Sequence, residues 1–379
     1  MNPRLIFFAL VFFMTATSPD VACSQAQEEA WSTIKKYFQP PDEFKDDFGR
    51  YRSPLNWSGN PPVKTAEQWR KRRHQIRSKW MQLLGEWPAP IRDQQLVVTK
   101  TRKRENFFQS TVTFRWTPTA ATSGYLLVPQ GPGPFPAVIT VFYEPETAIG
   151  EGKPHRDFAY QLVKRGFVTL SLGTAQATKN QTYALYFPSI EKAEIQPLSM
   201  LGYAASNAWY ALAQHEKVNP KKIGIVGHSF GGKWAMFSSC LFDQFACAAW
   251  SDPGIVFDES RPSVNYWEPW YLGYHPKPWR KRGVITAENP AKGLYPKLVQ
   301  TGRDLHELHA LMAPRPFLVS GGSEDPPQRW QALNHSRAVN QLLGWDNRVG
   351  MSNRPEHSPN RDSNEIIYRF FETFLPPND

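Results

Sequence analysis

The feature that most constrains the fold is a Gly-x-Ser-x-Gly motif at residues 227–231, which follows an apolar run and precedes a helix-like segment. A serine between two glycines at the end of a buried strand is typical of a tight turn that exposes the hydroxyl at the sheet edge. Side chains at Gly227 and Gly231 would collide where strand and helix pack closely. The pattern predicts that Ser229 is a nucleophile, and a glycine-rich structural turn is the alternative.

The sequence from residue 95 onward predicts the sheet that this motif requires. Three strand-like segments come first and indicate an antiparallel entry: 96–104, 107–116 and 124–128. Strands then alternate with helices, with strands predicted at 137–142, 168–172, 222–226, 246–250 and 316–320 and helices at 158–164, 199–215, 231–242, 304–312, 329–343 and 363–374. This alternation predicts one α/β domain over 95–379, with a mostly parallel sheet, helices on both faces and a lid-like insertion at about 252–300.

A nucleophilic serine needs a base and an acid that orients the base, expected in the order serine, acid, histidine. His357 is the predicted base because it lies in a loop just before the last predicted helix. Asp325 is the first choice for the acid, since it follows the strand at 316–320. Glu324 is the second choice and Asp252, just after the strand at 246–250, is the third.

The oxyanion of an acyl-transfer reaction needs two backbone N–H donors. Phe230, directly after the nucleophile, is expected to supply one of them. The loop after the strand at 137–142 is expected to supply the other, at Tyr143 or Glu144.

His306, Glu307 and His309 lie close together on a predicted helix and raise the question of a metal site. The two histidines lack the i, i+4 spacing of a zinc helix, and no third ligand stands out. We therefore expect no metal here, and interpret His306 as a packing or substrate-side residue.

The insertion combines aromatic residues with a basic run, namely Tyr266, Trp267, Trp270, Tyr271, Tyr274, Trp279 and Arg280-Lys281-Arg282. Loops at this place in an α/β sheet overhang the site. Aromatic faces stack on sugar rings, and basic groups bind carboxylates. Trp267 and Trp270 are therefore predicted to bind substrate, and a lid packed on itself is the alternative.

The first 26 residues have the pattern of a signal peptide, with Arg4, an apolar run at 5–16 and small residues at 22–26. The apolar run is too short for a permanent membrane span. We expect a secreted or periplasmic protein, with lipid attachment at Cys23 as the less favoured alternative. In such a compartment Cys240 and Cys247 either pair or stay as buried thiols.

Residues 27–94 form an N-terminal extension outside the predicted domain. Within it, 65–84 predicts a basic amphipathic helix whose charged side is either a solvated face or a patch for an anionic polymer. The whole chain carries 44 Lys+Arg against 34 Asp+Glu, a formal charge of +10. This excess permits an acidic partner, and export argues against nucleic acid.

Residues 95–376 resemble the α/β-hydrolase superfamily, and within it bacterial carbohydrate esterases related to glucuronoyl esterases and pectin methylesterase-type hydrolases. The resemblance rests on residues 227–233, on 306–316 and on His357. It implies that Lys233 contacts a sugar hydroxyl. Phe230 stands where glucuronoyl esterases have an arginine, which favours methyl esters of uronic acids over strict glucuronoyl esterase activity.

The resemblance implies a secreted serine hydrolase for an ester of a uronic acid, of the methyl or glucuronoyl type, in an acidic polysaccharide such as pectin. Such chemistry needs no metal or organic cofactor. The alternatives are an O-acetyl polysaccharide esterase, a peptidase of the same superfamily and a non-catalytic polysaccharide-binding protein.

Overall fold

A nine-stranded sheet runs through the part of the chain that the computed structural model describes, residues 19–57, 59–174, 184–261 and 271–377. The strands are β1 (Val97–Arg104), β2 (Phe107–Arg115), β3 (Ala121–Pro129), β4 (Phe135–Phe142), β5 (Val168–Gly173), β6 (Val218–His228), β7 (Cys247–Ser251), β8 (Phe317–Gly321) and β9 (Val349–Asn353). Their order across the sheet is β1-β2-β3-β5-β4-β6-β7-β8-β9.

The sheet is antiparallel at its beginning and parallel through the rest. β1, β2 and β3 pair antiparallel, and β3 is also antiparallel to β5. All pairings from β5 to β9 are parallel, so the predicted antiparallel entry and parallel body are confirmed. β5 and β6 flank β4 on opposite sides, so the chain changes winding direction there. Sites in such sheets form at that switch point, beyond the carboxyl ends of the strands.

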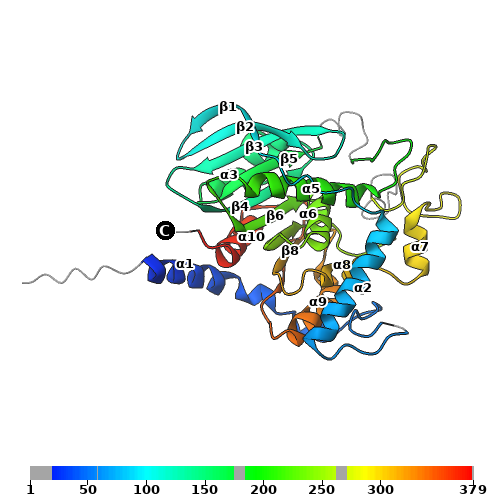
Figure 1. Cartoon of the computed structure of the whole chain (residues 1–379). Helices are drawn as coiled ribbons and strands as arrows, with labels where there is room; N and C mark the ends of the chain where they lie inside the picture. The colour runs from blue at the N-terminus through cyan, green and yellow to red at the C-terminus, as the bar shows by residue number, and fades with distance from the viewer. Residues whose placement is uncertain (1–18, 58, 175–183, 262–270, 378–379) are drawn as a thin grey trace, which may run out of the picture.

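Nine α-helices are assigned in the described residues: α1 (Pro19–Ile34), α2 (Ala66–Leu84), α3 (Phe158–Val163), α5 (Pro197–Ala213), α6 (Phe230–Leu241), α7 (Leu294–Gln300), α8 (His306–Ala310), α9 (Trp330–Leu342) and α10 (Arg361–Phe374). Short helical turns add η1 (Lys35–Phe38), η2 (Asp42–Phe44), η3 (Thr147–Glu151) and η5 (Pro327–Arg329). In Figure 1, β1–β3 form one end of the sheet, and α2 lies beyond the other end beside α8 and α9.

Apolar side chains of the central strands divide between two cores, as the two-residue repeat of a strand requires. Ile223 and Ile225 of β6 pack in the core on the α5 and α6 side, whereas Val226 packs in a second core on the α10 side. Phe38 of η1 joins that second core, and its ring stacks on Phe370 with 6.4 Å between the ring centroids. Both faces of the sheet are therefore covered, as predicted.

The sequence did not predict β9, because Gly350 and Ser352 interrupt its apolar pattern. The glycine is needed there, since a Cβ at Gly350 would meet the Phe38 ring at 2.9 Å. A strand with this composition is recognised only through its pairing with β8.

The predicted basic helix of the N-terminal extension is α2, and it begins with a capping box between Thr65 and Gln68. Its predicted apolar side is buried at Trp69, Ile76, Trp80 and Leu84. Two of its bases pack against the body, because Arg73 and Arg77 form ion pairs with Asp243. Other bases on α2, Arg70, Lys71 and Lys79, are exposed.

The buried carboxylate of Glu307 connects α2 to the domain through hydrogen bonds. Glu307 of α8 is 1% exposed and accepts hydrogen bonds from Trp80 Nε1 at 2.9 Å and from Arg52 Nη2 and Arg303 Nη1 at 2.8 Å each. Three donors from separate segments therefore converge on one side chain, which makes Glu307 the link between α8 and the N-terminal extension.

We expect Glu307→Gln to lower the free energy of unfolding by about 3 kcal/mol, because two guanidinium groups lose their buried counter-charge. Urea unfolding measures the change. The matched control is Glu67→Gln, which removes an exposed i,i+4 pair with Lys71 and should shift stability by less than about 0.5 kcal/mol. Equal shifts in the two variants would contradict the anchoring role.

Cys240 and Cys247 are both buried free thiols, so the structure favours the second of the two alternatives for them. None of the helices among the described residues is long and apolar enough to cross a membrane.

Candidate active site

Ser229 occupies the turn between β6 and α6, as its motif predicts. Its backbone has φ 58° and ψ −119°, a conformation that residues with a side chain rarely adopt. The turn is tied on both sides, because Ser229 N donates to the carbonyl of Ser251 at 2.8 Å and its own carbonyl accepts from Lys233 N at 3.0 Å. The strained turn is therefore part of the native hydrogen-bond network.

The two glycines of the motif allow this turn to pack against β4. A Cβ at Gly231 would lie 2.0 Å from the carbonyl oxygen of Val141, and one at Gly227 would lie 2.2 Å from the carbonyl oxygen of Gly231. Both obstacles are backbone atoms, which cannot rotate away. The glycines thus permit the close approach that the sequence predicted.

We expect Gly231→Ala to displace the turn from β4 and to lower both the melting temperature and hydrolytic activity, since overpacking typically costs about 1–3 kcal/mol or more. Gly232→Ala is the comparison, because the nearest contact of its Cβ would be 2.9 Å rather than 2.0 Å. Thermal unfolding and turnover of an aryl ester measure both effects. A smaller loss in Gly231→Ala than in Gly232→Ala would contradict this account.

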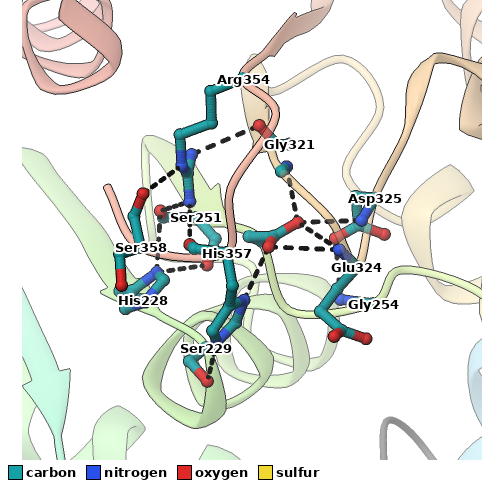
Figure 2. A network of polar contacts seen from close by, with 12 residues as sticks. His228, Ser229, Ser251, Gly254, Gly321, Glu324, Asp325, Arg354, His357 and Ser358 are labelled. Atoms are coloured by element: carbon teal, nitrogen blue, oxygen red, sulfur yellow. Dashed lines mark hydrogen bonds and ion pairs between the residues drawn. The ribbon is translucent and has the colours of Figure 1, made fainter. Parts of the chain in front are cut away.

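The structure brings Ser229 and His357 together across a long sequence separation. His357 Nε2 lies 2.9 Å from Ser229 Oγ, and Figure 2 shows the imidazole turned toward the serine. The other ring nitrogen, Nδ1, lies 2.7 Å from Oδ2 of Asp252. With a proton on Nδ1, Nε2 is free to accept the serine proton, which is the arrangement of a serine–histidine–acid triad.

Asp252 is fully buried directly after β7 and has a positive φ of 48°. Its Oδ1 accepts backbone N–H bonds from Gly322 at 2.6 Å and from Asp325 at 2.8 Å. The Glu324 N–H lies 3.2 Å from the same oxygen. The loop after β8 therefore holds one carboxylate oxygen, and the other oxygen faces His357.

Comparison with known proteins identifies the fold that carries this arrangement. A model of the dienelactone hydrolase family matches residues 122–256, which run from β3 through the Ser229 turn to just past Asp252. A glucuronoyl esterase from Solibacter usitatus superposes with a TM-score of 0.66 at 16% identity, over 85% of this chain and 97% of its own. This is an α/β-hydrolase fold.

Two more solved structures share the α/β-hydrolase fold of this chain. A promiscuous CE15 esterase from a marine bacterial metagenome has a TM-score of 0.62 at 16% identity, covering 86% of this chain and 97% of its own. A CE15 glucuronoyl esterase from Caldicellulosiruptor kristjansonii has a TM-score of 0.60 at 19% identity, covering 89% and 93%. The predicted fold and the resemblance to carbohydrate esterases are confirmed at the level of the fold. Among curated proteins, none matches the sequence.

Within this hydrolase fold, the prediction that Asp325 orients His357 is wrong. The Asp325 carboxylate instead accepts N–H bonds from Gly254 and Ile255, at 2.7 Å each. Burial, with the neighbouring Asp252 as second cause, raises the pKa of Asp325 to about 6. Glu324, the second choice, lies 3.2 Å from Arg261 Nη1. The acid that contacts His357 is Asp252, the third choice.

The prediction that Lys233 contacts a sugar also fails. Lys233 is 2% exposed, and its Nζ donates to the carbonyl oxygen of Gly254 at 2.9 Å. Burial lowers its pKa to about 7. Lys233 and Asp325 thus both bind the backbone of Gly254. Lys233 donates to its carbonyl, and Asp325 accepts from its N–H. Together they support the loop that leaves Asp252.

His306 is buried and packs against the N-terminal extension. Its Nε2 donates to the carbonyl of Arg52 at 2.7 Å, and its ring packs 5.2 Å from the ring of Tyr51. Burial lowers its pKa to about 4, so the ring is neutral at pH 7. These contacts favour the interpretation of His306 as a packing residue. Trp267 and Trp270 lie outside the described residues.

The two predicted oxyanion donors come from segments that meet beside Ser229. Phe230 begins α6 and Tyr143 follows β4, and their rings stack with centroids 5.1 Å apart. The contact at Gly231 brings the end of β4 against the first turn of α6. These positions suit two N–H groups aimed at one oxyanion, and their catalytic role stays a prediction.

The sequence interpretation missed Arg354, which shapes the His357 loop. Arg354 Nη2 donates to the carbonyl of His357 at 2.7 Å, and Nε donates to the carbonyl of Ser358 at 2.9 Å (Figure 2). Its Nη1 donates to the carbonyl of Ser320 at 2.8 Å. One guanidinium therefore links the loop that carries His357 to the end of β8 by hydrogen bonds. No motif marks this arginine beyond its position three residues before the histidine.

We looked for side chains that could hold a metal ion. Among the residues that the structure describes, no group of three or more His, Cys, Asp or Glu side chains is placed to hold a metal ion.

Proposed function

We propose that the protein is a secreted serine carboxylic-ester hydrolase that acts on an ester of a uronic acid in an acidic polysaccharide. The observation that carries the proposal is the continuous hydrogen-bonded path from Ser229 Oγ through His357 to the buried carboxylate of Asp252. This path provides a nucleophile, a base and an orienting acid.

In the acylation step, Ser229 Oγ attacks the ester carbonyl carbon while its proton passes to Nε2 of His357. The carbonyl oxygen gains negative charge, which the N–H groups of Phe230 and Tyr143 would stabilise. The tetrahedral intermediate then expels the alcohol, which takes the proton from Nε2. Asp252 stabilises the positive imidazolium that exists between these two transfers.

In the deacylation step, water attacks the Ser229 ester while His357 takes one water proton. Collapse of the second tetrahedral intermediate breaks the bond to Oγ, which regains a proton from Nε2. The products are a carboxylic acid and an alcohol, and the enzyme returns to its starting state. The ester and one water molecule are the only reactants consumed.

The choice of a polysaccharide ester rests on three supports. The solved structures that share the fold include glucuronoyl esterases. The chain has a formal charge of +10, which favours an acidic polymer. Aromatic and basic residues gather in the segment between β7 and α7, where loops overhang the carboxyl ends of the strands.

We propose export through a signal peptide at residues 1–26, followed by the extension at 27–94 and the catalytic domain at 95–379. The extension then belongs to the mature enzyme. In keeping with this, Gln27 Nε2 donates to the carbonyl of Thr373 in α10 at 2.6 Å, and Ala30 and Ile34 are fully buried.

A hydrolysis screen tests the substrate proposal. Purified enzyme is given methyl-esterified pectin, an aryl-alkyl ester of glucuronic acid and acetylated xylan, and released methanol, aryl alcohol and acetate are measured. We expect methanol or aryl alcohol from the uronate esters. Acetate alone would replace the proposal with an O-acetyl esterase, and no product from any ester would leave only a binding role.

A further inference from the structure

Arg156 is a half-buried cation at the carboxyl end of the sheet, in the loop between η3 and α3. Its guanidinium carbon lies 5.6 Å from the ring centroid of Phe142, the last residue of β4. Among the described residues, the guanidinium makes no hydrogen bond or ion pair. By contrast, the half-buried Arg165, a few residues further along, forms an ion pair with Glu365 at 2.7 Å.

The surroundings of Arg156 connect it to the candidate active site. The Phe142 ring lies 6.3 Å from the ring of His228, and the His228 ring lies 4.8 Å from that of His357. Burial lowers the pKa of His228 well below its ordinary value, and the neighbouring His357 and Arg156 lower it further. Arg156 therefore acts electrostatically on the residue directly before Ser229.

The loop of Arg156 also contacts α10, the helix that follows His357. The carbonyl of His155 accepts from Asn364 Nδ2 at 2.8 Å, near the start of α10. The Arg156 loop thus lies between the end of β4, which leads to Tyr143, and the helix that follows His357. This placement puts an unpaired positive charge on the flank of the triad.

An unpaired cation that is partly removed from water is costly unless a partner reaches it. Burial lowers the pKa of Arg156, which nonetheless stays charged at neutral pH. Glu144 and the Tyr143 hydroxyl act on it electrostatically, but neither forms a hydrogen bond or ion pair with it in the structure. A ligand anion is the natural complement, since a guanidinium fits a carboxylate through two parallel hydrogen bonds.

We propose that Arg156 is an anion-binding residue that holds the free carboxylate of the sugar next to the esterified one. The inference rests on the proposed function, because the esterified uronate has no free carboxylate of its own. It assigns the enzyme a preference for partly esterified chains, in which an acidic neighbour flanks the ester. Arg156 thereby determines specificity and takes no part in proton transfer.

The test compares Arg156→Gln with wild type on two substrates, pectin of low methyl esterification and neutral p-nitrophenyl acetate. We expect the ratio of kcat/KM for pectin to kcat/KM for the aryl ester to fall at least tenfold, through a higher KM for pectin. Arg156→Lys should recover part of that ratio. Lys153→Gln, an exposed cation in the same loop, is the matched control and should leave the ratio unchanged.

Two results would overturn the inference. One is an unchanged ratio in Arg156→Gln, and the other is an equal loss on both substrates, which would indicate a structural or oxyanion role. Thermal unfolding of each variant shows whether the fold is intact.

A second arm separates this inference from the proposed function. Trigalacturonate is tested as a competitive inhibitor of p-nitrophenyl acetate hydrolysis, which needs no pectin turnover. We expect inhibition of wild type and an inhibition constant at least tenfold higher in Arg156→Gln. If wild type releases no methanol from pectin but this shift occurs, the proposed ester is wrong and the anion site stands. If trigalacturonate does not inhibit wild type, the anion site is refuted.

Discussion

Asp252→Asn is expected to lower kcat for ester hydrolysis by roughly 10³- to 10⁴-fold, as loss of the acid does in other serine triads. The asparagine amide has no negative charge to stabilise the imidazolium of His357. It also presents an N–H donor that can favour the wrong tautomer of the ring. Asp252 is fully buried, so solvent cannot replace the lost charge. Steady-state kinetics on an aryl ester measures the change.

Asp325→Asn is the matched control for this prediction, because Asp325 is the neighbouring buried acid. Its carboxylate binds the N–H groups of Gly254 and Ile255 rather than His357. We expect a reduction in kcat of about tenfold or less, through loosening of the loop that carries Asp252. A larger loss in Asp325→Asn than in Asp252→Asn would return the role of triad acid to Asp325.

Ser229→Ala is expected to remove nearly all turnover, with a loss of about 10⁶-fold in kcat, comparable to nucleophile removal in other serine hydrolases. The methyl group of alanine fits the space of the serine side chain, so the melting temperature should change by only a few degrees. The control is Ser123→Ala on the exposed side of β3, which should keep wild-type activity. Residual turnover within tenfold of wild type would exclude Ser229 as the nucleophile.

The sequence predicted the sheet and the serine turn well because both depend on local patterns. The second half of β6, from Ile223 onward, is a buried run that leads into the serine turn, and the two glycines of that turn meet backbone atoms in the structure. The apolar repeat of α2 likewise matches its buried side. Such features follow from periodicity and from steric demands within a few residues.

The identity of the triad acid could not be read from the sequence in the same way. Asp252 and Asp325 follow neighbouring parallel strands, so both reach the same edge of the sheet. The choice depends on which loop turns toward His357. Gly322 makes that turn possible, since a Cβ there would lie 2.7 Å from Asp252 Oδ2 and 2.3 Å from the carbonyl of Glu356. Only the folded loops reveal this close approach.

Lys233 and His306 show a second limit of sequence interpretation. Polar residues in stretches that resemble a hydrolase family suggest contact with substrate, but both side chains are buried and bonded to backbone carbonyls. Lys233 follows Ser229 by one helical turn and supports the segment behind Asp252. A polar residue near a site can therefore hold the site together without touching its ligand.

The most direct test of the proposed mechanism is covalent labelling with an aryl organophosphonate, followed by intact mass measurement and peptide mapping. We expect one adduct per chain, located on Ser229 and absent from Ser229→Ala, and much slower labelling of His357→Ala and Asp252→Asn. A folded wild-type protein that stays unlabelled, or that is labelled at another residue, would contradict a hydrolase that works through Ser229.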